Sequence, residues 1–155
     1  MEPRPLPSAA LLLGLAGLLP FLACGLAVAS LDRAAGAPFM AALIGYGAVV
    51  LAFLGAVQWG LVLGGAPLPT DRRRLALGVA PALIGWLALL APLVLPAEAG
   101  LGALILGFAA TIAVESRFGW LPPGYAMLRW GLSAVVLAVL ITVLTLRLLG
   151  ATIIF

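Results

Sequence analysis

Long apolar runs, separated by short polar or proline-containing segments, make up most of the chain. The runs cover about residues 9–29, 39–63, 75–95, 99–116 and 130–149. Each is close to the ~20 residues that an α-helix needs to cross the hydrocarbon core of a bilayer. The pattern predicts an all-α, polytopic membrane protein in which residues 1–155 form one bundle of five transmembrane helices.

Prolines modify this pattern at several points. Pro20 lies inside the first run and predicts a kink near the middle of that helix, because proline lacks the backbone donor. Pro92 and Pro96 break the end of the third run and leave the fourth as the shortest. The aromatic and proline-rich segment 118–125 is expected to turn at the membrane interface before the last helix.

The composition also indicates that most of the chain is surrounded by lipid and not by water. Hydrophobic residues make up 65% of the chain, charged residues only 8%, and the mean hydropathy is +1.30. A water-soluble domain has about a quarter of its residues charged, so that class is excluded. Histidine is absent and Cys24 is the only cysteine, so the chain alone offers no disulfide and no ordinary metal site. We therefore expect no cofactor and no enzymatic activity.

The arginines predict the orientation in the membrane. With five crossings, six of the eight arginines fall on the side of the amino terminus: Arg4, Arg72, Arg73, Arg74, Arg117 and Arg129. The positive-inside rule then places the amino terminus in the cytoplasm and the carboxyl terminus in the periplasm. The first run resembles a secretory signal peptide, but it is long enough to span, and we expect it to be retained. The arginines do not cluster among aromatic residues on one face, so no nucleic-acid partner is expected.

Small residues recur every fourth position in the second run. Ala52, Ala56, Gly60 and Gly64 form a stripe on which another helix can approach closely. We expect this stripe to pack against a neighbouring helix of the same chain, and the alternative is a face for a partner subunit.

The polar residues within the runs are few. Tyr46, Gln58, Trp59 and Glu115 are the candidates for a polar pocket between helices. The preferred interpretation is that Gln58 joins helices by hydrogen bonds and that Glu115 ends its helix at the headgroups. In the alternative, Glu115 lies within the membrane and pairs with Arg117 or Arg129.

Basic residues next to the runs are candidate contacts for anionic lipid or for a partner protein. These are Arg72, Arg73, Arg74 and Arg129. Three consecutive arginines are fewer than the four to eight basic residues typical of a dedicated lipid site, so setting the orientation is their expected role.

Several short blocks resemble a known family. They are residues 14–21 (GLAGLLPF), the Tyr46-Gly47-Ala48 block, residues 53–55 (FLG), the Trp59-Gly60 pair, Pro81 with Trp86, and the Leu128-Arg129 pair. Together they resemble the bacterial and mitochondrial membrane protein family that includes transmembrane protein 69. The resemblance implies a small helical protein of the bacterial inner membrane, and it carries no catalytic residue to this chain. A weaker resemblance is to the tryptophan-rich sensory proteins, which are much richer in aromatic residues.

These features favour a non-enzymatic accessory subunit or assembly factor of a larger inner-membrane complex, respiratory or photosynthetic. Its expected partners are the lipid bilayer and other membrane subunits. The alternative is a small-molecule or lipid-binding protein, or a transporter, with its pocket around Tyr46, Gln58 and Glu115.

Overall fold

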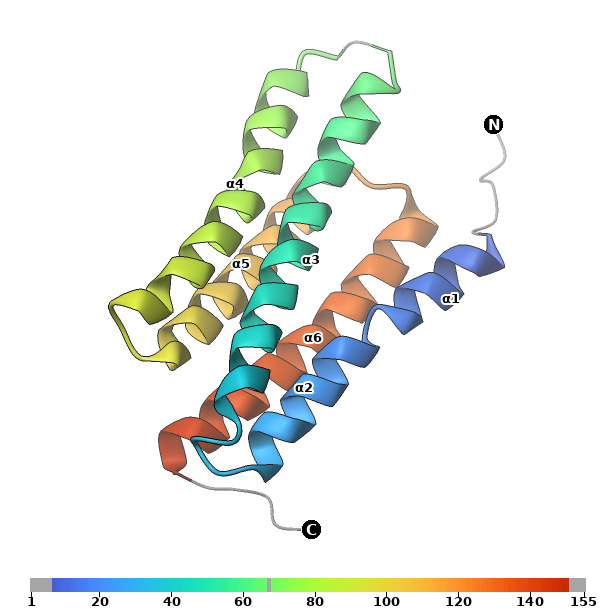
Figure 1. Ribbon diagram of the computed structural model, residues 1–155. Coiled ribbons are helices and arrows are strands. Elements are labelled where there is room, and N and C mark those ends of the chain that lie inside the picture. Colours follow the sequence, from blue (N-terminus) through green and yellow to red (C-terminus); the bar gives the residue numbers. More distant parts are fainter. Residues whose placement is uncertain (1–6, 67, 151–155) are drawn as a thin grey trace.

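The computed structural model describes residues 7–66 and 68–150, and short links join its helices. In chain order the elements are α1 (Ser8–Ala16), α2 (Leu19–Ser30), α3 (Ala37–Leu63), α4 (Asp71–Leu90), the 3₁₀ turn η1 (Ala91–Leu93), α5 (Ala97–Phe118) and α6 (Pro123–Leu149) (Figure 1). Five stretches are long and apolar enough to cross a membrane: Ser8–Ser30, Ala37–Leu63, Asp71–Leu93, Ala97–Phe118 and Gly124–Leu149. The predicted all-α class with five spanning helices is confirmed, and no strand occurs in the described part of the chain.

The first span is broken where the sequence predicts a kink. α1 ends at Ala16 and α2 begins at Leu19, with Pro20 in the first turn of α2. Proline cannot donate the backbone hydrogen bond that would continue the helix. The Tyr46 hydroxyl of α3 donates to the Gly17 carbonyl at 3.0 Å and so ties the break to the rest of the bundle.

Several helices are longer than the apolar runs that predicted them. α4 begins at Asp71, and α6 begins at Pro123, seven residues before the predicted position 130. α5 has 22 residues, which is about 33 Å of helix, so the fourth span is longer than its apolar run, although it remains the shortest of the five candidate spans. Only residues 119–122 link α5 to α6, and Gly119 ends α5 with a left-handed backbone (φ +60°).

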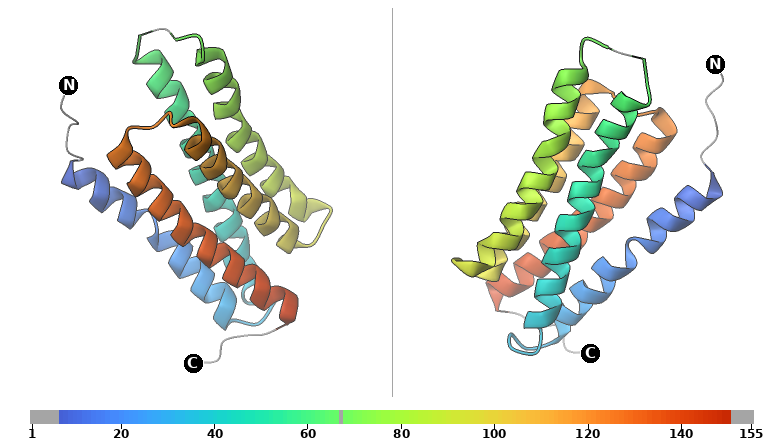
Figure 2. Two further views of the ribbon diagram at one scale, coloured as in Figure 1. Left: turned by 180° about the vertical axis from the view of Figure 1, so that it is seen from behind. Right: turned by 45° about the horizontal axis from the view of Figure 1, so that its top comes forward.

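The helices close into a ring around an apolar core. α3 contacts α2, α4 and α5, while α6 contacts α5 and α2. α1 contacts α6 and diverges from α3, as both views in Figure 2 show. The start of α1 and the end of α6 lie at opposite ends of the bundle, as an odd number of crossings requires (Figure 1).

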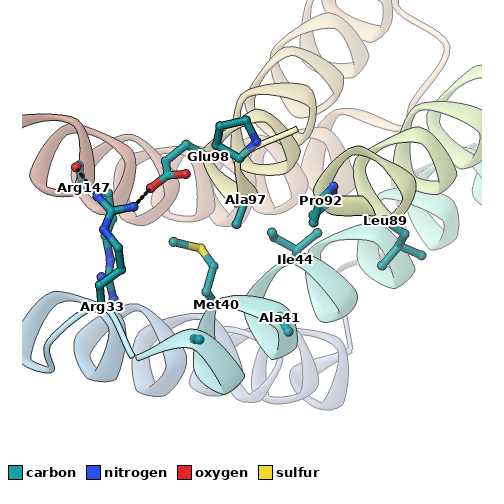
Figure 3. A pocket seen from close by; sticks show the side chains of 11 residues that line it. Arg33, Met40, Ala41, Ile44, Leu89, Pro92, Ala97, Glu98 and Arg147 are labelled. Carbon is teal, nitrogen blue, oxygen red and sulfur yellow. Dashed lines mark hydrogen bonds and ion pairs between the residues drawn. The ribbon is translucent and has the colours of Figure 1, made fainter. Parts of the chain in front are cut away.

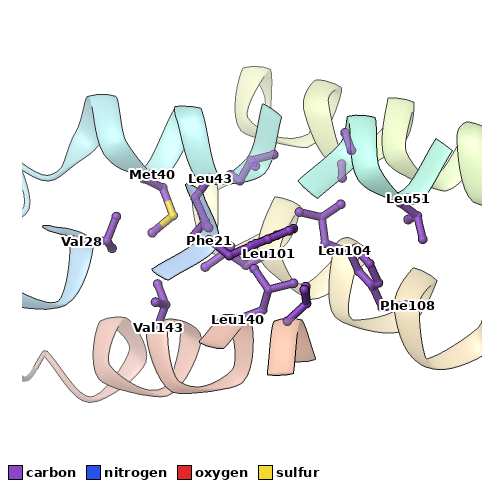
Figure 4. Packing of buried hydrophobic residues seen from close by; sticks show 14 residues of the cluster. Phe21, Val28, Met40, Leu43, Leu51, Leu101, Leu104, Phe108, Leu140 and Val143 are labelled. Carbon is purple, nitrogen blue, oxygen red and sulfur yellow. The ribbon is translucent and has the colours of Figure 1, made fainter. Parts of the chain in front are cut away.

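The core is built from large apolar side chains of α2, α3, α5 and α6. Phe21 lies near its centre, where its ring meets Tyr46 edge-on at 5.0 Å and Phe108 at 6.2 Å between centroids. Leucines from the neighbouring helices surround it (Figure 4). The outer surface is also apolar, and it includes Leu12, Leu63, Val94 and Leu106. This surface contacts the lipid bilayer, since in water such a surface would be unstable.

α3 and α4 approach until their backbones touch. A Cβ on Gly55 would overlap the carbonyl oxygen of Gly78, and a Cβ on Gly85 would lie 2.9 Å from the carbonyl oxygen of Ala48. The two contacts are seven residues apart on both antiparallel helices, which is two helical turns. The close approach therefore depends on a heptad spacing of small residues in each helix.

The predicted small-residue stripe is not this packing face. Ala56, Gly60 and Gly64 are exposed, and Ala52 is half-buried. Within the described residues, no atom outside the local helix lies within 4 Å of a Cβ placed on Gly60. The expectation of packing within the chain was therefore wrong. The residues that do pack are Ala48 and Gly55, on the inward side of the same helix.

Candidate functional site

A buried ion pair joins the last two helices. Glu115 of α5 and Arg129 of α6 have side chains that are only 4% and 2% exposed. Arg129 Nε donates to Glu115 Oε2 at 2.9 Å, and its Nη2 donates to Glu115 Oε1. This is the two-pronged geometry in which guanidinium and carboxylate groups bind most strongly.

The pair is tied to α3 by two further hydrogen bonds. Gln58 Nε2 donates to Glu115 Oε1 at 3.2 Å, and Arg129 Nη2 donates to the Leu54 carbonyl at 2.7 Å. The Glu115 carboxylate thus accepts from three nitrogen atoms. Polar groups in membrane helices are costly unless they find such partners inside the protein.

Arg74 extends the network to α4. Its Nη2 donates to Gln58 Oε1 and to the Trp120 carbonyl, both at 3.4 Å, and its guanidinium lies 5.6 Å from the centre of the Trp120 ring. Arg74 is buried, and its Nε has no hydrogen-bond partner in the described residues. We call Gln58, Arg74, Glu115 and Arg129 the four-helix charged cluster. Its formal charge is +1, because two arginines face one carboxylate.

The α3–α4 register explains why Gln58 meets Arg74. Gln58 is three residues beyond Gly55, and Arg74 is four residues before Gly78. In antiparallel helices that touch at Gly55 and Gly78, these positions lie one turn further along and opposite each other. The backbone contact therefore brings the glutamine amide within reach of the guanidinium.

Two cavities border the cluster. A small one of about 60 Å³ is lined by Gln58, Thr111 and Glu115 among others, and it has room for about one or two water molecules. A larger one of about 490 Å³ is lined by α1, the start of α2, α3 and α6. Its lining is mostly apolar, with Tyr46, Tyr125, Arg129 and Ser133 as polar members.

The structure divides the predicted polar pocket. Gln58 joins α3 to α5 by its hydrogen bond to Glu115, as the preferred interpretation of Gln58 expects. Glu115 is buried and paired with Arg129, as the alternative interpretation of Glu115 expects. Tyr46 lies apart, at the break between α1 and α2. Trp59 lies on the outer side of α3, 42% exposed, where its Nε1 donates to the Leu75 carbonyl at 3.1 Å.

The predicted basic contact surface is also divided. Arg74 and Arg129 are buried in the four-helix charged cluster, so they are not part of a lipid-facing surface. Arg72 and Arg73 are exposed, and the Arg73 guanidinium lies 4.5 Å from the centre of the Phe118 ring. Only these two of the four remain available to an outside anion.

Sequence reasoning missed three contributions to the cluster. The carbonyls of Leu54 and Trp120 belong to the backbone and leave no trace in residue type. Tyr125 accepts a hydrogen bond of 3.4 Å from Arg129 Nη1 one turn away on α6. That i, i+4 spacing is visible in the sequence, but only once α6 is known to include residue 125.

No group of three or more His, Cys, Asp or Glu side chains gathers into a metal site among residues 7–66 and 68–150. The four-helix charged cluster instead contains one carboxylate and two guanidinium groups, and guanidinium groups do not bind cations. Its contacts favour holding helices together over binding a metal.

Comparison with known proteins places the chain among membrane proteins. Residues 6–145 match the family described as "Protein of unknown function (DUF3429)". Transmembrane protein 69 of Xenopus tropicalis is 43% identical over 88 residues, which is 54% of this chain and 33% of that protein. The chain thus matches about a third of the length of this relative. No solved structure matches the chain. The resemblance inferred from the sequence blocks is confirmed.

Proposed function

The chain belongs to the DUF3429 family of membrane proteins, and we propose that it is a non-enzymatic accessory subunit or assembly factor of a larger inner-membrane complex. Respiratory and photosynthetic complexes are the expected class, because they are assembled from many small membrane subunits. The protein would act by packing against another subunit within the bilayer.

One observation carries this proposal. Ala56 and Gly60 of α3, with Gly64 directly after its last residue, form an exposed line that no described helix covers. Small residues at intervals of four let the backbone of a second helix approach closely. The exposed side chains of Phe53 and Leu63 flank the line and would pack beside such a helix. We call Ala56, Gly60 and Gly64 the outer α3 stripe.

The internal contacts support the same proposal. Three nitrogen donors occupy the Glu115 carboxylate, and Arg129 binds α3 and α5 at once. These bonds hold α3, α5 and α6 in fixed positions, which gives the outer α3 stripe a rigid support. A rigid surface loses little entropy when a partner binds.

The test is co-purification from native membranes in a mild detergent, followed by native gel electrophoresis and mass spectrometry. Gly60→Leu should reduce the co-purifying partner about tenfold or more, because the added side chain blocks close helix approach. Gly131→Leu is the matched control, since Gly131 is also exposed and helical, with nothing near a Cβ placed there. The proposal fails if the wild-type protein elutes alone and its deletion leaves every membrane complex intact.

The cavity of about 490 Å³ favours a second candidate function, the binding or transport of a small apolar molecule. Its volume lies in the ordinary range of ligand pockets, about 300–1,000 Å³, and Arg129 and Tyr46 provide polar groups at its wall. Leu132→Trp fills this cavity from α6. If the second candidate is right, a small molecule co-purifies with the wild type and with Gly60→Leu but not with Leu132→Trp.

A further inference from the structure

A third pocket lies at the opposite end of the bundle from the four-helix charged cluster. It has a volume of about 460 Å³ and is formed where the α2–α3 link, the start of α5 and the end of α6 meet. Figure 3 shows Arg33, Glu98 and Arg147 at one end of the pocket and Ile44, Leu89 and Pro92 at the other. The pocket is thus charged at one end and apolar along the rest.

The charged end carries more positive than negative charge. Arg33 Nη1 and Glu98 Oε1 form an ion pair of 2.6 Å, and Arg33 Nη2 donates to the Arg147 carbonyl at 3.3 Å. Arg147 makes no ion pair with the described residues. The two guanidinium groups and one carboxylate that line this end give the pocket wall a formal charge of +1. Asp32, next to Arg33 in the α2–α3 link, is not part of the lining, and its carboxylate accepts from the backbone N–H groups of Ala34 and Ala35.

Arg147 itself is held in the protein with hydrogen-bonding capacity left over. It is only 9% exposed, and its Nη2 donates to the Val28 carbonyl at 2.9 Å. Its buried Nε has no hydrogen-bond partner in the described residues. The Glu98 carboxylate at this end is bonded to Arg33 and not to Arg147. A bound anion would give the buried Arg147 guanidinium a direct partner of opposite charge.

The position of the Arg147 guanidinium is built into the fold. A Cβ on Gly36 would overlap Arg147 Nη2, so the guanidinium rests directly on the backbone of the α2–α3 link. Val28 of α2 provides the acceptor on the other side. A side chain at position 36 would force the guanidinium, the flexible end of Arg147, to move from this place.

We propose that this pocket binds an anionic lipid, whose phosphate pairs with Arg147 and Arg33 while part of one acyl chain lies along Met40, Ile44 and Pro92. The bilayer supplies such a ligand at this depth, because the pocket lies at the end of the spanning helices. A carboxylate on an alkyl chain, as in a free fatty acid, has the same recognition chemistry. This proposal does not depend on a partner protein.

The experiment uses the full chain in micelles and measures bound lipid by native mass spectrometry. The probes are phosphatidylglycerol, phosphatidylcholine of the same acyl chains, oleate, and inorganic phosphate. We expect the wild type to retain phosphatidylglycerol about tenfold more than phosphatidylcholine. Stronger retention of oleate than of phosphatidylglycerol would assign the pocket to a fatty acid and overturn the proposal that its ligand is a phospholipid. If inorganic phosphate binds and the three lipids do not, the pocket is a simple anion site, and the proposal that it binds a lipid is overturned.

Variants test the contributions of the charged end and the apolar part of the pocket to lipid binding separately. Arg147→Gln should abolish the preference for phosphatidylglycerol, whereas Arg72→Gln, an exposed arginine at the other end of the bundle, should leave it unchanged. Ala41→Trp fills the apolar part and should reduce retention with all charges kept. Equal retention of the two phospholipids by the wild type, or an unchanged preference in Arg147→Gln, would overturn the proposal.

Gly36→Ala provides a second route if Arg147→Gln does not fold. It keeps every charge but displaces the Arg147 guanidinium, so it should lower the preference for phosphatidylglycerol at an unchanged net charge. A folded Gly36→Ala variant with the preference of the wild type would contradict the assigned headgroup position.

Discussion

Glu115 and Arg129 each place a charge inside a membrane helix, and each meets its partner within the protein. Gln58 and the Leu54 carbonyl complete their hydrogen bonds. Removing one member of such a pair leaves the other buried without compensation, which is costlier than removing both. The two residues therefore depend on each other more than either does on the bilayer.

Glu115→Gln should lower the free energy of unfolding by about 3–5 kcal/mol, because it leaves Arg129 buried without a carboxylate. The double variant Glu115→Leu with Arg129→Met should cost less than Glu115→Gln. Unfolding in micelles by added dodecyl sulfate, followed by circular dichroism, measures both. Arg117→Gln is the control on the same helix, since Arg117 is exposed. A loss in Glu115→Gln no larger than in this control would contradict the structural role of the pair.

At the scale of the elements, the sequence predicts the number of spanning helices correctly but misplaces helix ends that carry charged residues. The apolar runs located all five spans, because hydropathy reports contact with lipid. The third and fifth runs began too late, after Arg74 and Arg129, because a charged residue was taken to lie in water. Hydropathy along one helix cannot show a counter-charge on another helix.

The residues through which α3 packs on α4 could not be identified from the sequence either. The four-residue interval of Ala52, Ala56, Gly60 and Gly64 is the more obvious pattern, but the helices meet at Ala48 and Gly55, seven residues apart. Both patterns are common in membrane helices. The position of the neighbouring helix determines which of the two sets of small residues is buried. The sequence of α3 alone does not show where α4 lies.

Gly55→Ala tests the packing of α3 on α4. The new methyl group would overlap a backbone oxygen of Gly78, which cannot turn away as a side chain would, so we expect a loss of about 1–3 kcal/mol in the free energy of unfolding. Gly60→Ala on the same helix meets nothing and should be neutral, or stabilising by up to about 1 kcal/mol through helix propensity. The same dodecyl sulfate titration compares them. Equal effects of the two variants would show that the close approach is unimportant.

At the scale of the whole molecule, the arginines are distributed unequally between the two ends of the bundle. Arg72, Arg73, Arg74, Arg117 and Arg129 lie near the end formed by the α3–α4 and α5–α6 links. Arg33 and Arg147 lie near the other end. The predicted orientation, with the amino terminus in the cytoplasm, follows from this difference.

Cysteine labelling tests the orientation. With Cys24 replaced by alanine, a membrane-impermeant maleimide should label Ala35→Cys in intact spheroplasts. It should label Gly65→Cys only after the membrane is permeabilised, because Gly65 lies in the α3–α4 link on the predicted cytoplasmic side. Detergent-solubilised protein, in which both positions are accessible, provides the control. The reverse pattern of labelling would invert the topology.

The four-helix charged cluster also constrains how the protein is made. An arginine within a membrane helix opposes its insertion, by about 2.5–3.5 kcal/mol at the helix centre and by less toward an end, where Arg129 lies in α6. Arg129 finds its carboxylate on α5, and only residues 119–122 separate the two helices. We therefore expect α5 and α6 to leave the translocon together as a hairpin. Gln58 and Arg74, synthesised earlier, would already be in the bilayer to receive them.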